Sequence, residues 1–237
     1  AVVKPQIQHF QFQTDMKIPR TGVMIVGLGG NNGTTLFTGR LANQKGLTWE
    51  TRRGTQKATY YGSLTQCTTT YLGDDAEGRQ IYAPFNELLP MISPNDLIVG
   101  GWDINKANLY EATRRARVME PDLINQLKGE LEAVVPLPAV FDPSFVAPNQ
   151  GERAENVIPG NKRQQLDTVR EQIRKFKADN KLEQLIILWS ANTERYCEVS
   201  DDVHGSIDAL MRAIDANHPE ISPSIIYAVA SILEGCP

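Results

Sequence analysis

The sequence has little of the chemistry that marks secreted or metal-dependent proteins. Its only cysteines are Cys67, Cys197 and Cys236. An odd number at such wide spacing disfavours a disulfide framework and indicates reduced thiols, as in a cytoplasmic protein. Its only histidines are His9, His204 and His218. They are scattered, and no Cys, His or Asp cluster has metal-ligand spacing, so the sequence predicts no metal site.

Long apolar runs and long basic runs are also missing. No apolar stretch approaches the roughly 20 residues of a membrane-spanning helix, and the N-terminus has no signal-peptide-like apolar segment. The formal net charge is −4, from 24 Lys and Arg against 28 Asp and Glu. Charge therefore gives no reason to expect a nucleic acid or a membrane as a partner. With 41% hydrophobic and 22% charged residues, the composition is that of a globular protein and excludes disorder over most of the chain.

Strands and helices alternate along most of the sequence. Apolar, β-branched runs predict strands at 23–28, 96–102, 136–141 and 185–189, and the continuous apolar character of the last predicts a buried strand. Helical spacing of apolar residues predicts helices that include 36–41, 109–118, 121–131, 163–177, 207–214 and 222–234. This alternation is typical of a doubly wound, Rossmann-like α/β fold, in which helices cover both faces of a mostly parallel sheet.

Two stretches fall outside the alternation. Residues 1–20 are polar and aperiodic, which predicts an N-terminal arm. Residues 44–95 are rich in Thr, Gly, Tyr and Gln, and we expect an insertion of short strands and loops there. The sequence thus predicts one Rossmann-like domain over 21–237 that contains this insertion. We expect its sheet to be incomplete in this chain, because no strand follows the last predicted helix.

A glycine-rich turn follows the first predicted strand and opens the first helix. It reads Gly27-Leu28-Gly29-Gly30-Asn31-Asn32-Gly33. Glycines permit a tight turn and let backbone N–H groups approach a pyrophosphate, and the helix N-terminus adds a partial positive charge. The flanking strand and helix favour a dinucleotide site, and a plain strand-to-helix turn is the alternative. The third glycine falls one position late, and the two inserted carboxamides can donate to phosphate oxygens.

Asp103 is the candidate for holding the adenosine ribose. The usual fingerprint places an acidic residue about 20 positions after the glycines, at the end of the next strand. Nothing suitable lies there, but Asp103 ends the strand at 96–102 once the insertion is set aside. A carboxylate accepts from both ribose hydroxyls and repels a 2′-phosphate, which predicts NAD rather than NADP. An N-cap of the following helix is the alternative role, and the two are compatible.

Five further motifs accompany the glycine turn, which continues into Thr34 and Thr35. They are Tyr61–Gln66, Gly100–Ile104, Ala147–Gln150, Leu188–Tyr196 and Ile221–Ser224. In this order, and from about residue 21 to residue 237, the set resembles the inositol-3-phosphate synthase (myo-inositol-1-phosphate synthase) family. The resemblance implies a cytoplasmic, homotetrameric, NAD-dependent isomerase that converts glucose 6-phosphate to inositol 3-phosphate, in inositol and phospholipid biosynthesis. NAD oxidises the substrate, enolisation and an aldol step close the ring, and the NADH formed reduces the ketone.

The resemblance also implies which residues contact NAD. They are Gly29, Gly30, Asn31 and Asn32 at the pyrophosphate, Asp103 at the ribose, Ala139 and Val140 on the adenine side, Gln150 and Arg153 in a loop, and Ser190, Ala191, Asn192 and Thr193 after the strand at 185–189. A polar loop with helix caps is the alternative for the last group. The family's catalytic lysines are expected beyond Pro237, so these 237 residues alone are expected to be inactive.

Two other functions stay open. One is another NAD-linked sugar-phosphate oxidoreductase, which would accumulate NADH in the presence of its substrate. The other is a non-catalytic NAD-binding or scaffold module, in which NAD binding would alter association with another chain and no chemistry would follow.

Overall fold

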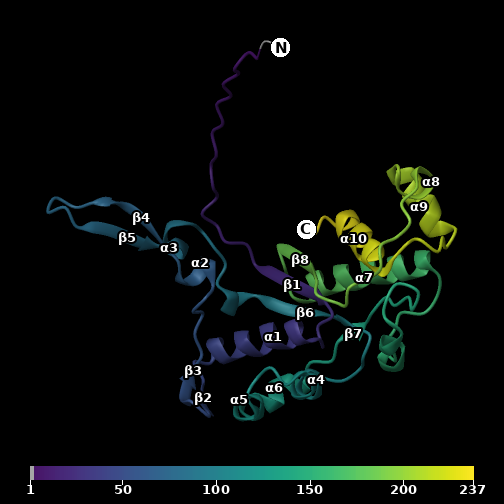
Figure 1. The fold of residues 1–237 in the computed structure, drawn as a ribbon, viewed down its shortest axis with the longest axis horizontal. Helices are drawn as coiled ribbons and strands as arrows, with labels where there is room; N and C mark the ends of the chain where they lie inside the picture. The colour runs from purple at the N-terminus through teal and green to yellow at the C-terminus, as the bar shows by residue number, and fades with distance from the viewer. Residues whose placement is uncertain (1–2) are drawn as a thin grey trace. The chain divides into compact units, whose positions relative to one another are not determined.

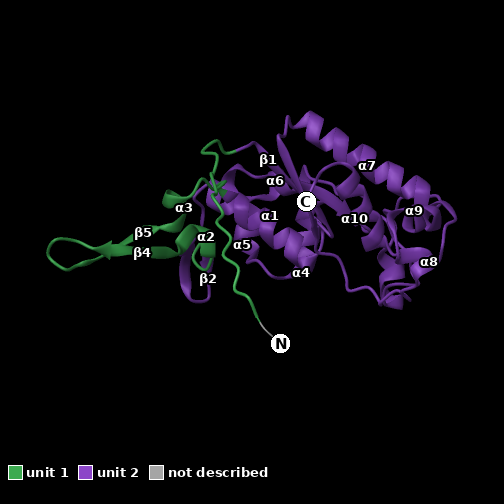
Figure 2. Cartoon of the chain, turned by 90° about the horizontal axis from the view of Figure 1, so that it is seen from above, with its two compact units in different colours: residues 1–18, 60–93 green, residues 19–59, 94–237 purple. Residues whose placement is uncertain are grey.

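The computed structural model describes residues 3–237, which divide into two compact units. The smaller unit consists of the residues up to 18 together with 60–93, and the larger unit of 19–59 together with 94–237 (Figure 2). The larger unit contains the sheet and the glycine turn. The domain limits expected from the sequence stay a prediction.

A four-stranded parallel sheet forms the centre of the larger unit (Figure 1). In spatial order its strands are β7 (Leu137–Pro138), β6 (Ile98–Asp103), β1 (Thr21–Val26) and β8 (Gln184–Trp189). The last residue of β1, Val26, pairs with Trp102 on one side and with Trp189 on the other. The carboxyl ends of three strands therefore meet at one edge, and the predicted parallel α/β architecture is confirmed.

Helices cover both faces of this sheet. One face carries α1 (Asn31–Gln44), α4 (Leu109–Ala116), α5 (Pro121–Gln126) and α6 (Lys128–Glu132), and the other carries α7 (Lys162–Asp179), α9 (Ile207–Asp215) and α10 (Pro223–Leu233). Val23 and Ile25 of β1 enter the first hydrophobic core, and Met24 and Val26 enter the second. Because successive side chains of a strand point to opposite faces, a strand between two helical layers must be apolar throughout.

The predicted strand at 185–189 is confirmed as β8, but the prediction that it is buried is wrong. Leu185 is buried, but Ile186, Leu188 and Trp189 keep 38%, 43% and 37% of their surface exposed. The reason is the place of β8 in the sheet, since β1 is its only partner strand among the described residues. Beyond β8, the N–H of Ile187 donates to the carbonyl of Pro237.

Some helix limits also differ from the predicted ones. Arg117 adopts a left-handed conformation (φ 54°) and ends α4 two residues before the predicted limit. The predicted helix over 121–131 is two helices, α5 and α6, because the backbone of Leu127 (φ −101°, ψ 12°) leaves the helical region between them. Outside residues 44–95, the pattern does not reveal two short elements, the 3₁₀ helix Pro148–Arg153 and α8 (Asp201–His204).

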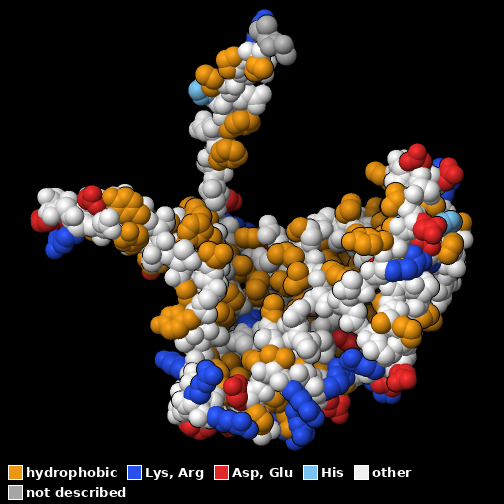
Figure 3. Space-filling view, in the orientation of Figure 1, with side chains coloured by type: hydrophobic (Ala, Val, Ile, Leu, Met, Phe, Trp, Pro, Cys, Tyr) orange, Lys and Arg blue, Asp and Glu red, His pale blue; other side chains and the backbone are white. Residues whose placement is uncertain are grey.

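Residues 44–95 contain the short strands expected of an insertion. In the larger unit, β2 (Thr48–Thr51) and β3 (Gly54–Lys57) form a hairpin, and a 3₁₀ turn (Pro94–Asp96) precedes β6. The smaller unit contains α2 (Leu64–Cys67), β4 (Thr69–Asp74), β5 (Gln80–Pro84) and α3 (Phe85–Leu88). β4 and β5 form a second hairpin that exposes apolar side chains (Figure 3), among them Tyr71, Leu72, Ile81 and Tyr82. Residues 3–20 form neither helix nor strand, and no helix of the described chain is long and apolar enough to cross a membrane.

Candidate functional site

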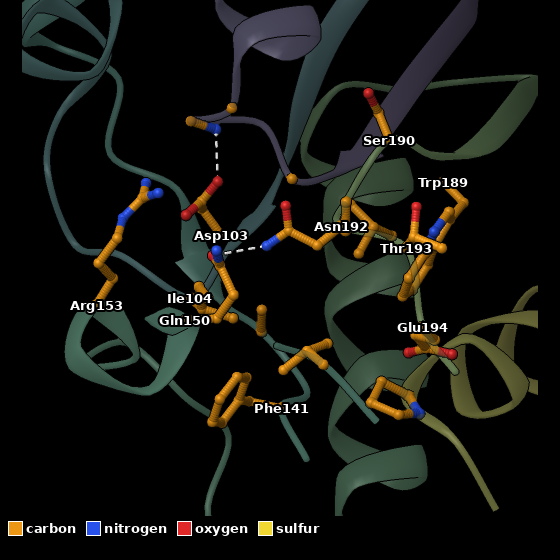
Figure 4. Close-up of a pocket in the computed structure, with 18 of the residues that line it drawn as sticks. Asp103, Ile104, Phe141, Gln150, Arg153, Trp189, Ser190, Asn192, Thr193 and Glu194 are labelled. Carbon is orange, nitrogen blue, oxygen red and sulfur yellow. Dashed lines mark hydrogen bonds between the residues drawn. The ribbon is translucent and has the colours of Figure 1, made fainter. Parts of the chain in front are cut away.

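A cavity of about 540 Å³ lies at the carboxyl ends of β1, β6 and β8. Open α/β sheets bind ligands at the carboxyl ends of their strands, where the connections lead to opposite sides of the first strand. Here β6 and β8 lie on opposite sides of β1. Every residue of the cofactor site expected from the sequence lines it: Gly29, Gly30, Asn31, Asn32, Asp103, Ala139, Val140, Gln150, Arg153, Ser190, Ala191, Asn192 and Thr193 (Figure 4). Segments that are far apart in the sequence therefore meet at one cavity.

The glycine turn is packed between the ends of β6 and β8. The N–H groups of Gly27 and Leu28 both donate to the carbonyl of Trp102, at 2.8 and 2.9 Å. Gly27 has φ 91°, and a Cβ atom there would lie 2.9 Å from both the Cα of Ala191 and the carbonyl oxygen of Ser190. The turn therefore needs glycine at this position, both for its backbone conformation and for its close contact with the loop after β8.

The N-terminus of α1 opens into the cavity. Gly30 is the N-cap and offers no side chain, and no acidic residue lies in the first turn of α1. The free N–H groups of this turn and the partial positive charge of the helix suit a phosphate. Gly33 brings α1 against the glycine turn, since a Cβ atom there would overlap the carbonyl oxygen of Leu28.

Asp103 is buried at the end of β6 and holds the glycine turn. Its Oδ2 accepts from the N–H of Gly29 at 2.8 Å, and its Oδ1 accepts from the N–H of Asn105 at 2.9 Å. Each carboxylate oxygen keeps acceptor capacity for a donor in the cavity, which suits a pair of ribose hydroxyls. Burial raises the pKa of the carboxyl group, and the two N–H donors and the charges of Arg115 and Arg153 oppose this rise.

Asp103 does not cap the following helix. The N-cap of α4 is Asn108, whose side chain accepts from the N–H of Glu111 at 3.0 Å. The alternative role that the sequence suggested for Asp103 is therefore wrong. The helix begins six residues later than Asp103, and the carboxylate serves the glycine turn instead.

Arg115 of α4 lines the same cavity, and sequence reasoning missed it. Its Nη2 donates to the carbonyl of Gly29 and its Nη1 to Oδ1 of Asn105, both at 3.0 Å. Both backbone groups of Gly29 are thus hydrogen-bonded, its N–H to Asp103 and its carbonyl to Arg115. No motif marks Arg115, because Arg114 is its neighbour in sequence and only the fold turns one of them toward the glycine turn.

The loop after β8 closes the other side of the cavity. The N–H of Ser190 donates to the carbonyl of Val26 at 2.9 Å, and Nδ2 of Asn192 donates to Oε1 of Gln150 at 2.7 Å (Figure 4). Glu194 also lines the cavity and was not predicted. Its carboxylate accepts from the N–H and the hydroxyl of Ser224, at 3.2 and 2.6 Å. These bonds attach the loop to the first turn of α10.

Ala139 and Val140 form one wall of the cavity, and the side chain of Tyr227 supports this wall by a hydrogen bond. The N–H of Val140 donates to the hydroxyl of Tyr227 at 3.1 Å. Tyr227 is fully buried, which raises the pKa of its hydroxyl, and its ring meets those of Trp102 and Trp189 edge-on at 5.1 and 6.0 Å between centroids. Trp189 itself lines the cavity.

Arg195 joins the loop after β8 to two other segments. Its Nη1 and Nη2 each donate to a carboxylate oxygen of Glu220 at 2.9 Å, and its guanidinium lies 4.1 Å from the centre of the Phe145 ring. The bidentate pair holds the pKa of the Glu220 carboxyl at about 2, and a hydrogen bond from the N–H of Glu198 adds to this effect.

Acid should release this ion pair. The pKa of Glu220 is about 2 in the folded protein and 4.5 without its partners. Its contribution is therefore complete above pH 4.5 and is lost as the pH falls toward 2. In urea unfolding, the stability difference between the wild type and Glu220→Gln should shrink across this window. Glu152→Gln, at an exposed residue that forms no ion pair with the described chain, is the control; equal pH dependence of both variants would contradict the assignment.

The described residues offer no group of three or more His, Cys, Asp or Glu side chains arranged to hold a metal ion. The cavity lining likewise contains no lysine, histidine, cysteine or tyrosine among the residues that the structure describes. Its charged groups are carboxylates and arginines, which bind and orient a ligand by hydrogen bonding.

Comparison with known proteins identifies the family. A family model for the NAD-binding domain of myo-inositol-1-phosphate synthase matches residues 21–237. Inositol-3-phosphate synthase isozyme 1 of Arabidopsis thaliana is 48% identical over 236 residues, which cover 100% of this chain and 46% of that protein. The Saccharomyces cerevisiae inositol-3-phosphate synthase is 49% identical over 245 residues, which cover 99% of this chain and 46% of the relative.

A solved structure agrees with these relatives. The crystal structure of inositol-3-phosphate synthase from Caenorhabditis elegans matches with a TM-score of 0.91 and 51% identity, over 93% of this chain and 44% of that chain. The chain thus spans a little less than half the length of the relatives that it matches. On its fold, its glycine turn and these matches, the chain belongs to the myo-inositol-1-phosphate synthase family.

Proposed function

We propose that this chain is the NAD-binding part of an inositol-3-phosphate synthase. Such an enzyme converts D-glucose 6-phosphate to 1D-myo-inositol 3-phosphate by internal oxidation, enolisation, aldol cyclisation and reduction. The observation that carries the proposal is the single cavity lined by every residue that the family resemblance implies for NAD. The identity of nearly half to the A. thaliana and S. cerevisiae enzymes supports the choice of substrate.

Different lining residues suit the successive parts of NAD, from the pyrophosphate to the adenine. The uncapped N-terminus of α1 suits the pyrophosphate, Asp103 suits the adenosine ribose, and Ala139 and Val140 offer an apolar wall to the adenine. NAD, when bound, supplies the hydride acceptor and then the hydride donor of the reaction. The chain's own residues bind the dinucleotide, orient it and attach its surroundings to β6, β8 and α10.

The carboxyl groups that line the cavity are engaged in holding the chain around it. Enolisation and aldol closure require a general acid and a general base near the substrate. The titratable carboxyl groups that line the cavity are those of Asp103, Asp142 and Glu194. Asp103 and Glu194 already accept hydrogen bonds from the glycine turn and from α10. Asp142 accepts from the N–H and the hydroxyl of Ser144 and forms an ion pair with Lys162. We therefore propose that these residues bind NAD and that these 237 residues alone do not convert glucose 6-phosphate.

The test measures NAD binding and turnover with the same protein. In calorimetry we expect Asp103→Ala to weaken NAD binding roughly 10- to 100-fold, because a buried charged acceptor for two hydroxyl groups is lost. Asp167→Ala, at an exposed carboxylate of α7, should bind NAD as the wild type does. Incubation with NAD and glucose 6-phosphate should yield neither inositol phosphate nor accumulated NADH.

Each possible result bears on a different part of the proposed function. Wild-type affinity in Asp103→Ala would show that the ribose assignment is wrong. Formation of inositol phosphate would overturn the proposed inactivity of these residues alone. Net NADH formation would favour another NAD-linked sugar-phosphate oxidoreductase over a synthase, because a synthase reoxidises its NADH within each cycle.

The cellular setting belongs to the same proposal. We propose a cytoplasmic, homotetrameric enzyme that supplies inositol for phospholipid biosynthesis. The free thiols of Cys67, Cys197 and Cys236 support a reducing compartment. The exposed apolar side chains of the β4–β5 hairpin support assembly with another protein surface.

A further inference from the structure

Two arginines share one end of the cavity with Asp103. Arg115, from α4, and Arg153, from the 3₁₀ helix after β7, both line the cavity beside this carboxylate. Figure 4 shows the Arg153 side chain extending alongside Asp103, with its guanidinium level with the carboxylate. This end of the cavity thus holds two positive groups and one negative group.

Neither arginine donates a hydrogen bond to the Asp103 carboxylate. Asp103 takes its hydrogen bonds from the N–H groups of Gly29 and Asn105, and it forms no ion pair with the described residues. Arg115 is oriented by bonds to the Gly29 carbonyl and to Asn105, which engage one hydrogen on each terminal nitrogen. The Arg153 side chain forms neither a hydrogen bond nor an ion pair with another described residue.

The charges of the three groups act on one another. Burial and the nearby charge of Arg153 lower the pKa of the Arg115 guanidinium, while Asp103 opposes this effect. The two guanidinium groups thus repel each other, and each attracts the Asp103 carboxylate.

We propose that Asp103, Arg115 and Arg153 set the choice of dinucleotide, and that Asp103 alone prevents the two arginines from holding a phosphate on the adenosine ribose. This inference rests on the proposed NAD site. Paired guanidinium groups are the donors that a phosphate dianion prefers, because each presents parallel N–H bonds. A carboxylate in the same place repels that phosphate and accepts from ribose hydroxyls instead. The site excludes NADP by one negative charge, and the cationic donors that NADP needs are already in place.

The experiment measures the preference between ligands that differ only in the ribose phosphate. Dissociation constants are determined for NADP and NAD, and for adenosine 2′,5′-bisphosphate and AMP, with the wild type and with Asp103→Ser, which removes the charge and makes room. We expect Asp103→Ser to raise the preference for the phosphorylated ligand of each pair by roughly tenfold or more, because charge-assisted hydrogen bonds replace repulsion. Unchanged preferences would overturn the proposal.

Double variants identify the cations. Adding Arg115→Gln or Arg153→Gln to Asp103→Ser should remove most of the gained preference. Adding Arg114→Gln, the neighbouring arginine of α4 that contacts the Tyr110 ring and does not line the cavity, should leave the gain intact. An equal loss with Arg114→Gln would overturn the roles of Arg115 and Arg153. Because each result is a ratio of two ligands, a general disturbance of the glycine turn cancels.

Two further measurements guard against misfolding and against failure of the underlying site. Asp103→Asn removes the charge with almost no change in shape, and it should shift the ratio in the same direction as Asp103→Ser. In the otherwise unchanged protein, Arg115→Gln and Arg153→Gln should each weaken the bisphosphate more than AMP. Absence of NAD and AMP binding in the wild type would refute the proposed function. If NAD binds but the Asp103 variants do not change the preference between the phosphorylated and the unphosphorylated ligand, only this inference is refuted.

Discussion

Replacing Gly33 with alanine should destabilise the larger unit and weaken NAD binding together. A Cβ atom there would lie 2.4 Å from the carbonyl oxygen of Leu28 and 2.7 Å from the carbonyl carbon and the Cα of the same residue. These are backbone atoms, so no change of rotamer relieves the overlap and α1 must move away from the turn. We expect the free energy of unfolding to fall by about 1–3 kcal/mol. Since the first N–H groups of α1 move too, NAD affinity should fall roughly tenfold or more.

The matched control is Gly39→Ala on the same helix. A Cβ atom at Gly39 would meet no described atom within 4 Å outside its own stretch of α1, because this part of the helix leaves open space beside it. Alanine is the better helix former, so Gly39→Ala should stabilise by about 0.5–1 kcal/mol and leave NAD affinity unchanged. Urea unfolding followed by circular dichroism and calorimetry with NAD measure both effects. If the two alanine variants proved equally stable, close packing of α1 on the turn would be wrong.

Replacing Trp102 with alanine should give the largest loss of stability, about 3–5 kcal/mol. Trp102 is fully buried in β6, between β7 and β1. Its ring packs edge-on against Tyr227, and its Nε1 donates to Oε1 of Gln172 on α7 at 2.6 Å. Its backbone carbonyl also accepts the hydrogen bonds from the N–H groups of Gly27 and Leu28 in the glycine turn. A cavity under that turn should therefore lower both the urea midpoint and the affinity for NAD.

Substitutions by phenylalanine separate the hydrogen bond from the volume. Trp102→Phe leaves Oε1 of Gln172 without its donor, a loss of about 1–3 kcal/mol beyond the change in packing. Trp49 of β2 has a buried Nε1 that no group of the described residues accepts from, so Trp49→Phe removes an unsatisfied group and should cost less. Circular dichroism is the appropriate signal, because both variants lose a tryptophan. A larger loss in Trp49→Phe than in Trp102→Phe would contradict this account.

Local rules and the family resemblance predict the parallel sheet, the glycine turn and thirteen of the residues that line the cavity. A short apolar run bounded by glycines predicts β1 because both of its faces are buried. The contact of Asp103 with the glycine turn follows from strand ends meeting at one edge of a parallel sheet. Ala139 and Val140 are different, because nothing in their local sequence points to a ligand and only the resemblance to the family placed them in the site.

What the sequence did not predict depends on which elements become neighbours. The apolar run of β8 has the composition of a buried strand, but burial depends on whether a second strand pairs with it. Arg114 and Arg115 differ by 100° in direction around α4, and the sequence does not say which one faces the turn. Asp103 and Asn108 are both good helix caps, and the choice between them depends on the hydrogen bond that Gly29 offers to Asp103.

The hydrogen bond between Gly29 and Asp103 spans 74 positions of sequence. Together with the register of β1 against β6, it joins the two halves of the site directly. The closure entropy of a connecting loop grows only slowly with its length. The β4–β5 hairpin within this connecting segment is therefore free to lengthen, shorten or diverge during evolution while the dinucleotide pocket stays intact.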